Sequence, residues 1–298
     1  MPDYNSPSTN LYQHDGISIH SFLKSDDQNL DKKTVDSFGN EWNRFKEFDK
    51  DELTKIGDDY FDVVDLSSLS GKVCLDVGCG SGRWAKYLAP YVKFIEAMDP
   101  SSSVFSAATF LSGERNVRIT QAGVNAIPFP DNSFDFVYSL GVLHHLPDTE
   151  LAIQHCFEKT KPGGWFLLYL YYNLDNRTIL HKILFGITNQ MRKQISRLPS
   201  KFKSMVCDAI AIFIYWPLSK IASLLSLFSV KTANAFPLGY YRKTSFHIMR
   251  NDSLDRFGTP LELRFSKLEI TSMLERSGFR NLTFSKKQPY WHVIAQRP

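Results

Sequence analysis

A glycine-rich turn that follows an acidic residue is the strongest chemical signature of this 298-residue chain. The segment 73–84 reads Val-Cys-Leu-Asp-Val-Gly-Cys-Gly-Ser-Gly-Arg-Trp, and its acid is Asp76. The glycines are Gly78, Gly80 and Gly82. Glycines at this spacing let the backbone turn tightly and bring its N–H groups against a ligand, and the helical pattern over 83–91 adds a positive dipole end. The turn predicts a site for a small polar ligand at the carboxyl end of a strand.

The residues around the turn narrow the choice of ligand. A phosphate-binding P-loop closes on Gly-Lys-Ser/Thr, whereas this turn closes on Gly-Arg-Trp. A dinucleotide fingerprint has the spacing G-x-G-x-x-G, whereas this turn has G-x-G-x-G. A second strand pattern over 93–98 ends in Asp99, 21 residues after Gly78. A carboxylate at that distance predicts hydrogen bonds to the hydroxyls of a ribose.

Four signals in chain order resemble the class I S-adenosylmethionine (SAM) methyltransferases. They are the turn at 76–82, the loop 127–137, the strand exit 139–146 and the Lys-Pro-Gly-Gly turn at 161–164. The resemblance is closest to the small-molecule methyltransferases of ubiquinone and menaquinone biosynthesis. It covers residues 70–172 well and 260–298 moderately.

The resemblance implies both a fold and a cofactor. The fold is α/β, a doubly wound, seven-stranded Rossmann-like sheet with its last strand antiparallel and a helical insertion after strand five. The cofactor is S-adenosyl-L-methionine, with Asp76 near its methionine amino group and Asp99 at its ribose. No metal site is expected. The implied cofactor-binding residues are Asp76, Gly78, Cys79, Gly80, Gly82, Asp99, Pro100, Val124, Asn125, Ser139 and Leu140.

The adenine contact departs from the pattern of the family. Many relatives place an acid a few residues before Leu-Pro-Phe, and that position here is Gly123. The amides of Asn125 or Gln121, or the backbone N–H groups near Val124, are the alternatives for contacting the ring.

Two adjacent histidines, His144 and His145, follow the fourth strand of the core, where open α/β sheets bind ligands. An imidazole is well matched to accept a proton near pH 7, so either residue is a candidate general base. The alternative is that the pair mainly shapes the loop. Tyr171 and Tyr172 follow strand five and are expected at the same substrate mouth.

The patterns divide the chain into four regions. They are an N-terminal extension with a lid helix (1–69), a SAM-binding core (70–172), a helical insertion (173–258) and a C-terminal helix and hairpin (259–298). Residues 1–30 are expected to be disordered or loosely attached. A helix is expected over 34–53, and its aromatic residues form either a lid or a face packed on the core. These aromatic residues are Phe38, Trp42, Phe45 and Phe48.

The C-terminal region carries its own start and stop signals. Ser266 and Glu269 form a capping-box pattern that begins a helix, and Gly278 predicts its end. The segments 281–285 and 290–296 are expected to form an antiparallel pair.

The insertion is basic and apolar. Between 176 and 251 there are twelve Lys and Arg residues and one acid, Asp208, whereas the net charge of the whole chain is +4. Apolar residues at helical spacing over 180–198 predict a basic amphipathic helix. The apolar run that follows, over 209–230, contains Pro217 and Lys220. It is either a buried helical subdomain, a segment that rests on a bilayer or, disfavoured by these two residues, a membrane span.

Several functions are excluded by missing patterns. Methyltransferases of adenine and cytosine amino groups place Asp/Asn-Pro-Pro-Tyr/Phe after strand four, where this chain has Ser-Leu-Gly-Val. A Pro-Cys pair for cytosine C5, paired glutamates for arginine methylation and clustered carboxylates for metal-dependent catechol methylation are not evident either. The four cysteines lack metal or redox spacing, and Cys74 is expected in a core strand.

We therefore expect a methyltransferase that moves a methyl group from SAM to a small-molecule acceptor, with O-methylation favoured. The acceptor is expected to be lipid-linked or anionic, or a sugar or isoprenoid intermediate, and not a nucleic acid. No signal peptide is visible, so a cytoplasmic protein is expected, at the inner face of the membrane if 176–230 contacts it. The alternatives are a SAM-binding regulatory protein without transferase activity and, less favoured, an NAD-dependent oxidoreductase.

Overall fold

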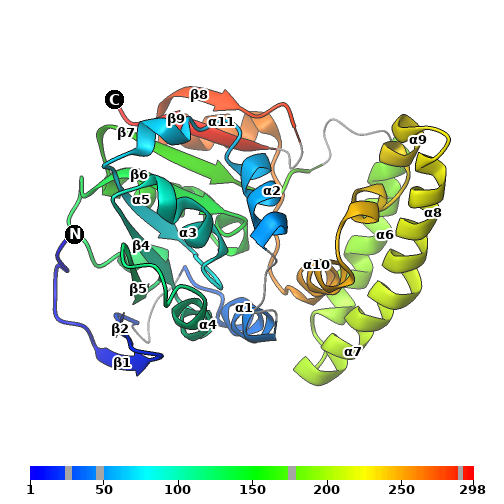
Figure 1. Ribbon diagram of the computed structural model, residues 1–298, viewed down its shortest axis with the longest axis horizontal. Helices are drawn as coiled ribbons and strands as arrows, with labels where there is room; N and C mark the ends of the chain where they lie inside the picture. The colour runs from blue at the N-terminus through cyan, green and yellow to red at the C-terminus, as the bar shows by residue number, and fades with distance from the viewer. Residues whose placement is uncertain (24–28, 45–49, 174–178, 288–290) are drawn as a thin grey trace. The chain divides into compact units, whose positions relative to one another are not determined.

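The computed structural model describes residues 1–23, 29–44, 50–173, 179–287 and 291–298. The chain divides into two compact units (Figure 1). Unit 1 consists of Met1–Asn176 and Leu261–Pro298, and unit 2 of Arg177–Pro260. Unit 1 contains a sheet with helices on both faces, and the described part of unit 2 is helical.

The sheet of unit 1 contains nine strands of the described residues in the order β1-β2-β5-β4-β3-β6-β7-β9-β8. From β2 to β7 in this order neighbouring strands are parallel, whereas β1, β9 and β8 each pair antiparallel. The strands are β1 (Asn10–His14), β2 (Ile17–Ser21), β3 (Val73–Val77), β4 (Phe94–Asp99), β5 (Val117–Gln121), β6 (Phe134–Leu140), β7 (Thr160–Tyr169), β8 (Arg280–Phe284) and β9 (His292–Gln296).

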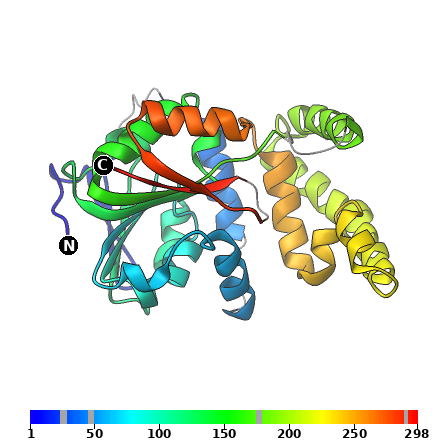
Figure 2. The same cartoon turned by 90° about the horizontal axis from the view of Figure 1, so that it is seen from above.

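Helices cover both faces of this sheet (Figure 2). Strands β3 and β4 are almost wholly buried, as a near-continuous apolar sequence predicts for parallel strands covered on both sides. One face packs against α2 (Lys50–Tyr60), α3 (Arg83–Leu88) and α4 (Ser103–Phe110), with α1 (Lys32–Arg44) against α4. The other face packs against α5 (Thr149–Lys159) and α11 (Lys267–Arg276). Short 3-10 turns are η1 (Leu66–Leu69), η2 (Ala89–Tyr91), η3 (Val124–Ala126), η4 (Leu143–His145) and, in unit 2, η6 (Gly239–Lys243).

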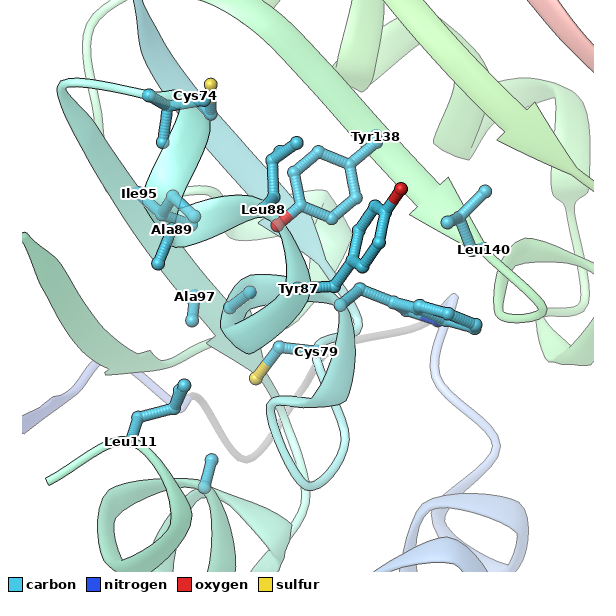
Figure 3. Packing of buried hydrophobic residues seen from close by; sticks show 14 of the residues in the cluster. Cys74, Cys79, Tyr87, Leu88, Ala89, Ile95, Ala97, Leu111, Tyr138 and Leu140 are labelled. Atoms are coloured by element: carbon cyan, nitrogen blue, oxygen red, sulfur yellow. The ribbon is translucent and has the colours of Figure 1, made fainter. Parts of the chain in front are cut away.

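The core on the α3 face surrounds aromatic side chains. Figure 3 shows Tyr138 from β6 next to Tyr87 and Leu88 from α3, and Cys74 from β3 belongs to the same cluster. Tyr138 and Cys74 are both fully buried, so the expectation of Cys74 in a core strand is confirmed.

The described residues form nine strands, not the seven expected, and the expectation that residues 1–30 are disordered or loosely attached is wrong for the described part of this segment. The described part of residues 1–30 contains the hairpin β1–β2, whose second strand extends the sheet alongside β5. Asp15 and Gly16 form its two-residue turn with φ of 47° and 78°, the left-handed backbone that such a turn requires. Ile19 is fully buried, which anchors the hairpin to the core.

Two helices, α1 and α2, stand where one was expected over 34–53. Residues 45–49 and the side chain of Trp42 lie outside the described residues, so the lid prediction for Trp42, Phe45 and Phe48 is not tested. Phe38 is half-buried, and its ring centroid lies 4.7 Å from that of His145.

The predicted start and end of the C-terminal helix are confirmed. The Ser266 hydroxyl accepts from the Glu269 N–H at 3.2 Å, and the Glu269 carboxylate accepts from the Ser266 N–H at 2.7 Å, which completes the capping box of α11. Gly278 follows this helix with φ of +106°. Strands β8 and β9 form the antiparallel pair.

Unit 2 is built around one long helix. Ser200–Ser226 runs without a break through α7, η5 and α8, and Pro217 lies in the first turn of α8 just after the wider π turn η5. By length and composition alone this 27-residue helix could cross a membrane, with a mean hydropathy of 1.5 over 18 residues. The helices are α6 (Ile179–Ile195), α7 (Ser200–Ile210), η5 (Ala211–Tyr215), α8 (Trp216–Ser226), α9 (Val230–Ala235) and α10 (Phe246–Gly258).

Candidate functional site

The glycine turn joins β3 to α3 at the carboxyl end of the sheet. Gly78 has φ of +81°, and a Cβ added there would lie 2.4 Å from Cγ1 of Val142. The turn therefore packs directly against the loop after β6, and only glycine fits at this position. This close approach brings the ends of β3 and β6 to one place.

The N–H groups of the turn are already used within the protein. Those of Gly78 and Cys79 donate to the Met98 carbonyl at 2.7 and 2.9 Å, and that of Gly80 donates to Oδ2 of Asp99 at 3.0 Å. The expectation that these N–H groups face a ligand is therefore wrong for the three residues. The turn provides room for a ligand, and its hydrogen bonds tie β3 to β4.

Asp99 ends β4 and holds the next loop. Its Oδ1 accepts from the N–H of Ser101 at 2.8 Å and from the Ser101 hydroxyl at 2.6 Å, in addition to the Gly80 bond at Oδ2. A carboxylate can accept about four hydrogen bonds, so these three leave capacity for a ribose hydroxyl.

Asp76 is buried beneath the turn. Neither carboxylate oxygen has a hydrogen-bond partner among the described residues, although buried carboxylates are normally paired. Burial raises the pKa of Asp76 well above its ordinary value. The hydroxyl of Tyr138, which lies nearby without hydrogen-bond geometry, opposes the increase more than the charge of Asp99 adds to it, and Arg83 opposes it slightly. A cation that donates hydrogen bonds would satisfy this site. The methionine amino group of SAM is such a cation, so the chemistry of Asp76 fits the cofactor.

A cleft with about 330 Å³ of open volume, partly continuous with solvent, lies over the carboxyl ends of β3, β4, β5 and β6. Of the predicted cofactor residues, Gly78, Pro100 and Val124 line it. Its walls are mainly apolar, as a site for a flat aromatic ring requires. The other lining residues are Asn29, Leu30, Val77, Met98, Ala122, Gly123, Val142, Leu143 and Leu146.

The two amides considered for the adenine contact bond within the protein. Gln121 donates to the Ser101 carbonyl at 3.3 Å, and Asn125 Oδ1 accepts from the Asn29 amide at 3.2 Å. Among the alternatives, Val124 is the residue that lines the cleft.

Other predicted cofactor residues pack inside the protein and do not line this cleft. The Ser139 hydroxyl is fully buried and donates to the Val77 carbonyl at 2.9 Å, which joins β6 to β3. Leu140 and Cys79 are buried in the core on the α3 face. Gly82, with φ of +85°, precedes α3 as its N-cap.

His144 and His145 lie in η4, directly after β6, and their ring centroids are 4.0 Å apart. His145 Nδ1 donates to the Leu261 carbonyl at 2.7 Å, which places its lone pair on Nε2. His144 stacks on Tyr171, with ring centroids 3.9 Å apart. Burial, with smaller effects of His145 and Arg264, lowers the pKa of His144 well below its ordinary value. His144 is therefore neutral at pH 7 and a weak proton acceptor.

An extended segment after unit 2 lines this histidine cluster, and the sequence reasoning missed its charged residues. The Leu263 N–H donates to the His144 carbonyl at 2.9 Å, and Arg264 donates to the carboxylate of Glu262 at 2.8 Å and to the Tyr172 carbonyl at 3.1 Å. The side chain of Glu262 is 1% exposed. The alternation Glu-Leu-Arg, which places both charges on one side of an extended chain, is the signal that could have identified the pair.

Part of the chain matches known proteins in sequence. Residues 75–168 match the family described as Methyltransferase domain. The chain is similar to the ubiquinone biosynthesis O-methyltransferase of Chromobacterium violaceum, with 32% identity over 146 residues, 46% of this chain and 62% of that protein. It is also similar to the demethylmenaquinone methyltransferase of Geobacillus kaustophilus, with 36% identity over 106 residues, 32% of this chain and 43% of that protein.

Among solved structures, a SAM-dependent methyltransferase from Aquifex aeolicus shares 16% identity with a TM-score of 0.44, over 84% of this chain and 98% of that one. The chain spans less than two thirds of the length of the two curated relatives named above. The segment that matches the family supplies every residue that lines the cleft except Asn29 and Leu30. Residues 75–168 therefore match the methyltransferase domain family in sequence.

Proposed function

We propose that this chain transfers a methyl group from SAM to a small-molecule acceptor, with O-methylation favoured and C-methylation next. The observation that carries the proposal is the buried Asp76 carboxylate, which has no hydrogen-bond partner among the described residues and lies under the glycine turn. A fold accepts such a cost when a ligand offsets it.

The residues of the chain have distinct tasks in this proposal. SAM, when bound, supplies an electrophilic methyl group on a sulfonium centre. Asp76 binds the amino group of the cofactor, Asp99 a ribose hydroxyl, and the apolar walls around Val124 the adenine ring. Positioning and exclusion of water are the main contributions that such a site makes to the rate.

A hydroxyl acceptor must also lose a proton. We assign the acceptance of that proton to His145, because its Nδ1–H donates to the Leu261 carbonyl and its lone pair is on Nε2. His144 is the weaker candidate because burial lowers its pKa. In this assignment His144 positions the ring of His145, and the Glu262–Arg264 pair holds the segment whose Leu263 N–H donates to the His144 carbonyl.

The acceptor class is proposed from two supports. One relative is named a ubiquinone biosynthesis O-methyltransferase and another a demethylmenaquinone methyltransferase, which favours an acceptor with an isoprenoid or lipid-linked tail. The basic charge of the insertion favours an anionic amphiphile. The rival is a SAM-binding regulatory protein that transfers nothing.

The test combines binding and transfer. Calorimetry with SAM and with its demethylated product measures cofactor binding, and methyl-labelled SAM with a cell extract, followed by phase partition, measures transfer. Label in the organic phase supports the proposed acceptor class, and label confined to the aqueous phase contradicts it. His145→Asn should bind SAM as the wild type does and transfer at least about 100-fold more slowly. SAM binding without transfer into any extract favours the regulatory rival.

A further inference from the structure

The long helix Ser200–Ser226 of unit 2 has its apolar residues on the outside. Only 28% of its most apolar 18-residue window is buried. Its outer face is defined by Phe202, Met205, Phe213, Trp216 and Leu224, together with Leu227 directly after the last residue of the helix, and these side chains have exposures between 48% and 78%. These residues recur at helical spacing over about 40 Å, at about 1.5 Å per residue.

The inner face of the same helix consists mainly of small and polar residues, with Ile210 and Tyr215 as its large buried side chains. It is defined by Lys203, Cys207, Ile210, Ala211, Tyr215, Ser219 and Ala222, each at most 8% exposed. In a helix that packs on a water-soluble core the apolar stripe is the buried one. The reversed arrangement is typical of helices that pack through small residues and face lipid.

Helix α10 lies alongside α7 on this inner side (Figure 1). The Ser253 hydroxyl donates to the Cys207 carbonyl at 2.8 Å, and Arg250 binds Asp208 through two nitrogens at 3.1 and 3.0 Å. A Cβ on Gly258 would lie 3.2 Å from the Lys203 side chain. The contact is thus close and polar, and it leaves the outer face uncovered by α10.

Charge identifies the occupant of the outer face. Unit 2 carries thirteen Lys and Arg residues and three acids, a net charge of +10. A second copy would bring two surfaces of the same sign together, whereas anionic lipid headgroups are complementary to both the apolar and the basic residues. Exposed Lys193, Arg197 and Lys201 flank one end of the face. Lys220 lies on the face itself, with its ammonium 6.0 Å from the ring of Trp216, as in side chains that keep an apolar stem in lipid and a charge in water.

We propose that the outer face of the long helix rests on an anionic bilayer, with the helix parallel to the membrane plane. A spanning arrangement is disfavoured because Lys203, Asp208 and Lys220 would all enter the hydrocarbon. The proposal does not depend on the proposed reaction. Docking keeps the chain at the surface where the proposed lipid-linked acceptor resides, which fits the location expected from the sequence, the inner face of the membrane.

The experiment is flotation of the full chain, without SAM, with vesicles of phosphatidylcholine alone and with about 30% phosphatidylglycerol. We expect binding to the anionic vesicles in about 0.05 M salt and a loss of most binding in about 0.5 M salt. The variant Phe202→Ser/Phe213→Ser should bind at least about tenfold more weakly, because two exposed rings no longer enter the interface. Leu268→Ser is the matched control, since Leu268 is 77% exposed on α11 of unit 1, and it should bind as the wild type does.

Three results would overturn the proposal. The first is a wild type that stays unbound on anionic vesicles at low salt. The second is a double variant that binds equally well while its circular dichroism and SAM affinity match those of the wild type. The third is a protein that alkaline carbonate does not release from membranes, because that behaviour indicates a span. Because the flotation experiment contains no SAM, a failure to bind vesicles does not contradict the methyl-transfer proposal. In the same way, a failure to transfer a methyl group does not contradict membrane docking.

Discussion

The main-chain N–H of Tyr171 donates to Nδ1 of His144 at 3.4 Å, and the two rings stack with their centroids 3.9 Å apart. An Nδ1 that accepts a hydrogen bond carries no proton, so the neutral tautomer of His144 has its proton on Nε2. The stack and the burial together keep this imidazole out of contact with water. The fold therefore opposes the charged form of His144.

The lowered pKa of His144 predicts that the protein loses stability in acid. The lowered pKa of the folded state means that the unfolded chain binds a proton that the folded chain does not, once the pH falls below about 6.5. The stabilising contribution is present above that pH and is lost below it, by about 1.4 kcal/mol per pH unit. His144→Gln should unfold with a smaller pH dependence in urea between pH 7.5 and 5.5. The exposed residue His247, changed to Gln, is the control, and equal slopes for His144→Gln and wild type would contradict the prediction.

Asp76 predicts opposite effects on binding and stability. Asp76→Asn removes a charged partner of the cofactor amino group, so the Kd for SAM should rise about 10- to 100-fold in calorimetry. Because the pKa of Asp76 is raised in the folded protein, the free energy of unfolding decreases as the pH rises above 3.8, the ordinary pKa of an aspartate. Without SAM, the Asp76→Asn variant should therefore be more stable than the wild type at pH 7. The exposed residue Asp65, changed to Asn, should leave SAM affinity unchanged. A stable variant with unaltered affinity would remove Asp76 from the site.

The glycine turn offers a matched pair of substitutions. Gly78 and Gly71 have φ of +81° and +76°, but an added Cβ meets Val142 at Gly78 and nothing within 4 Å at Gly71. Gly71→Ala should cost about 1 kcal/mol of unfolding free energy from backbone strain alone. Gly78→Ala should cost about 2 to 4 kcal/mol and abolish SAM binding, because the side chain also displaces the loop after β6. Equal costs in urea unfolding would show that the clash is absent.

The sequence was informative where local chemistry determines structure. A buried parallel strand followed by glycines can be recognised at β3 because the turn at Gly78 tolerates no other residue. The capping box at Ser266 and Glu269 is equally local. The hairpin β1–β2 was missed although Asp15-Gly16 is a strong turn signal, because its flanking strands are short and polar, and their burial depends on β5.

The candidate site was predictable only in part, because several of its contacts join distant segments. Asn29 lies in the cleft and bonds to the Asp148 carbonyl at 2.9 Å, 119 residues away, and no spacing along the chain predicts such a contact. Arg264 donates to the Tyr172 carbonyl, although the two residues are 92 positions apart and all of unit 2 lies between them in the sequence. The sequence also could not predict that the apolar face of the long helix is exposed, because the pattern of apolar residues is the same whichever face is buried.

Glu96 lies outside the candidate site, and its burial predicts how the stability of the fold depends on pH. It is fully buried on β4, where Oε2 accepts from Arg118 at 2.7 Å and Oε1 from the Thr120 hydroxyl at 2.5 Å. Burial raises the pKa of Glu96 to about 7, against the opposing effect of Arg118. The protonated form is therefore favoured by the fold, and its stabilising contribution is present below about 4.5 and lost as the pH rises through 7. Glu96→Gln stays uncharged and keeps an acceptor for Thr120, so wild type should lose about 3 kcal/mol relative to it between pH 4.5 and 8. Glu114→Gln, at a partly exposed ion pair with Lys86, is the control in urea unfolding. A constant difference between wild type and Glu96→Gln across this range would mean that Arg118 keeps the carboxylate ionised throughout.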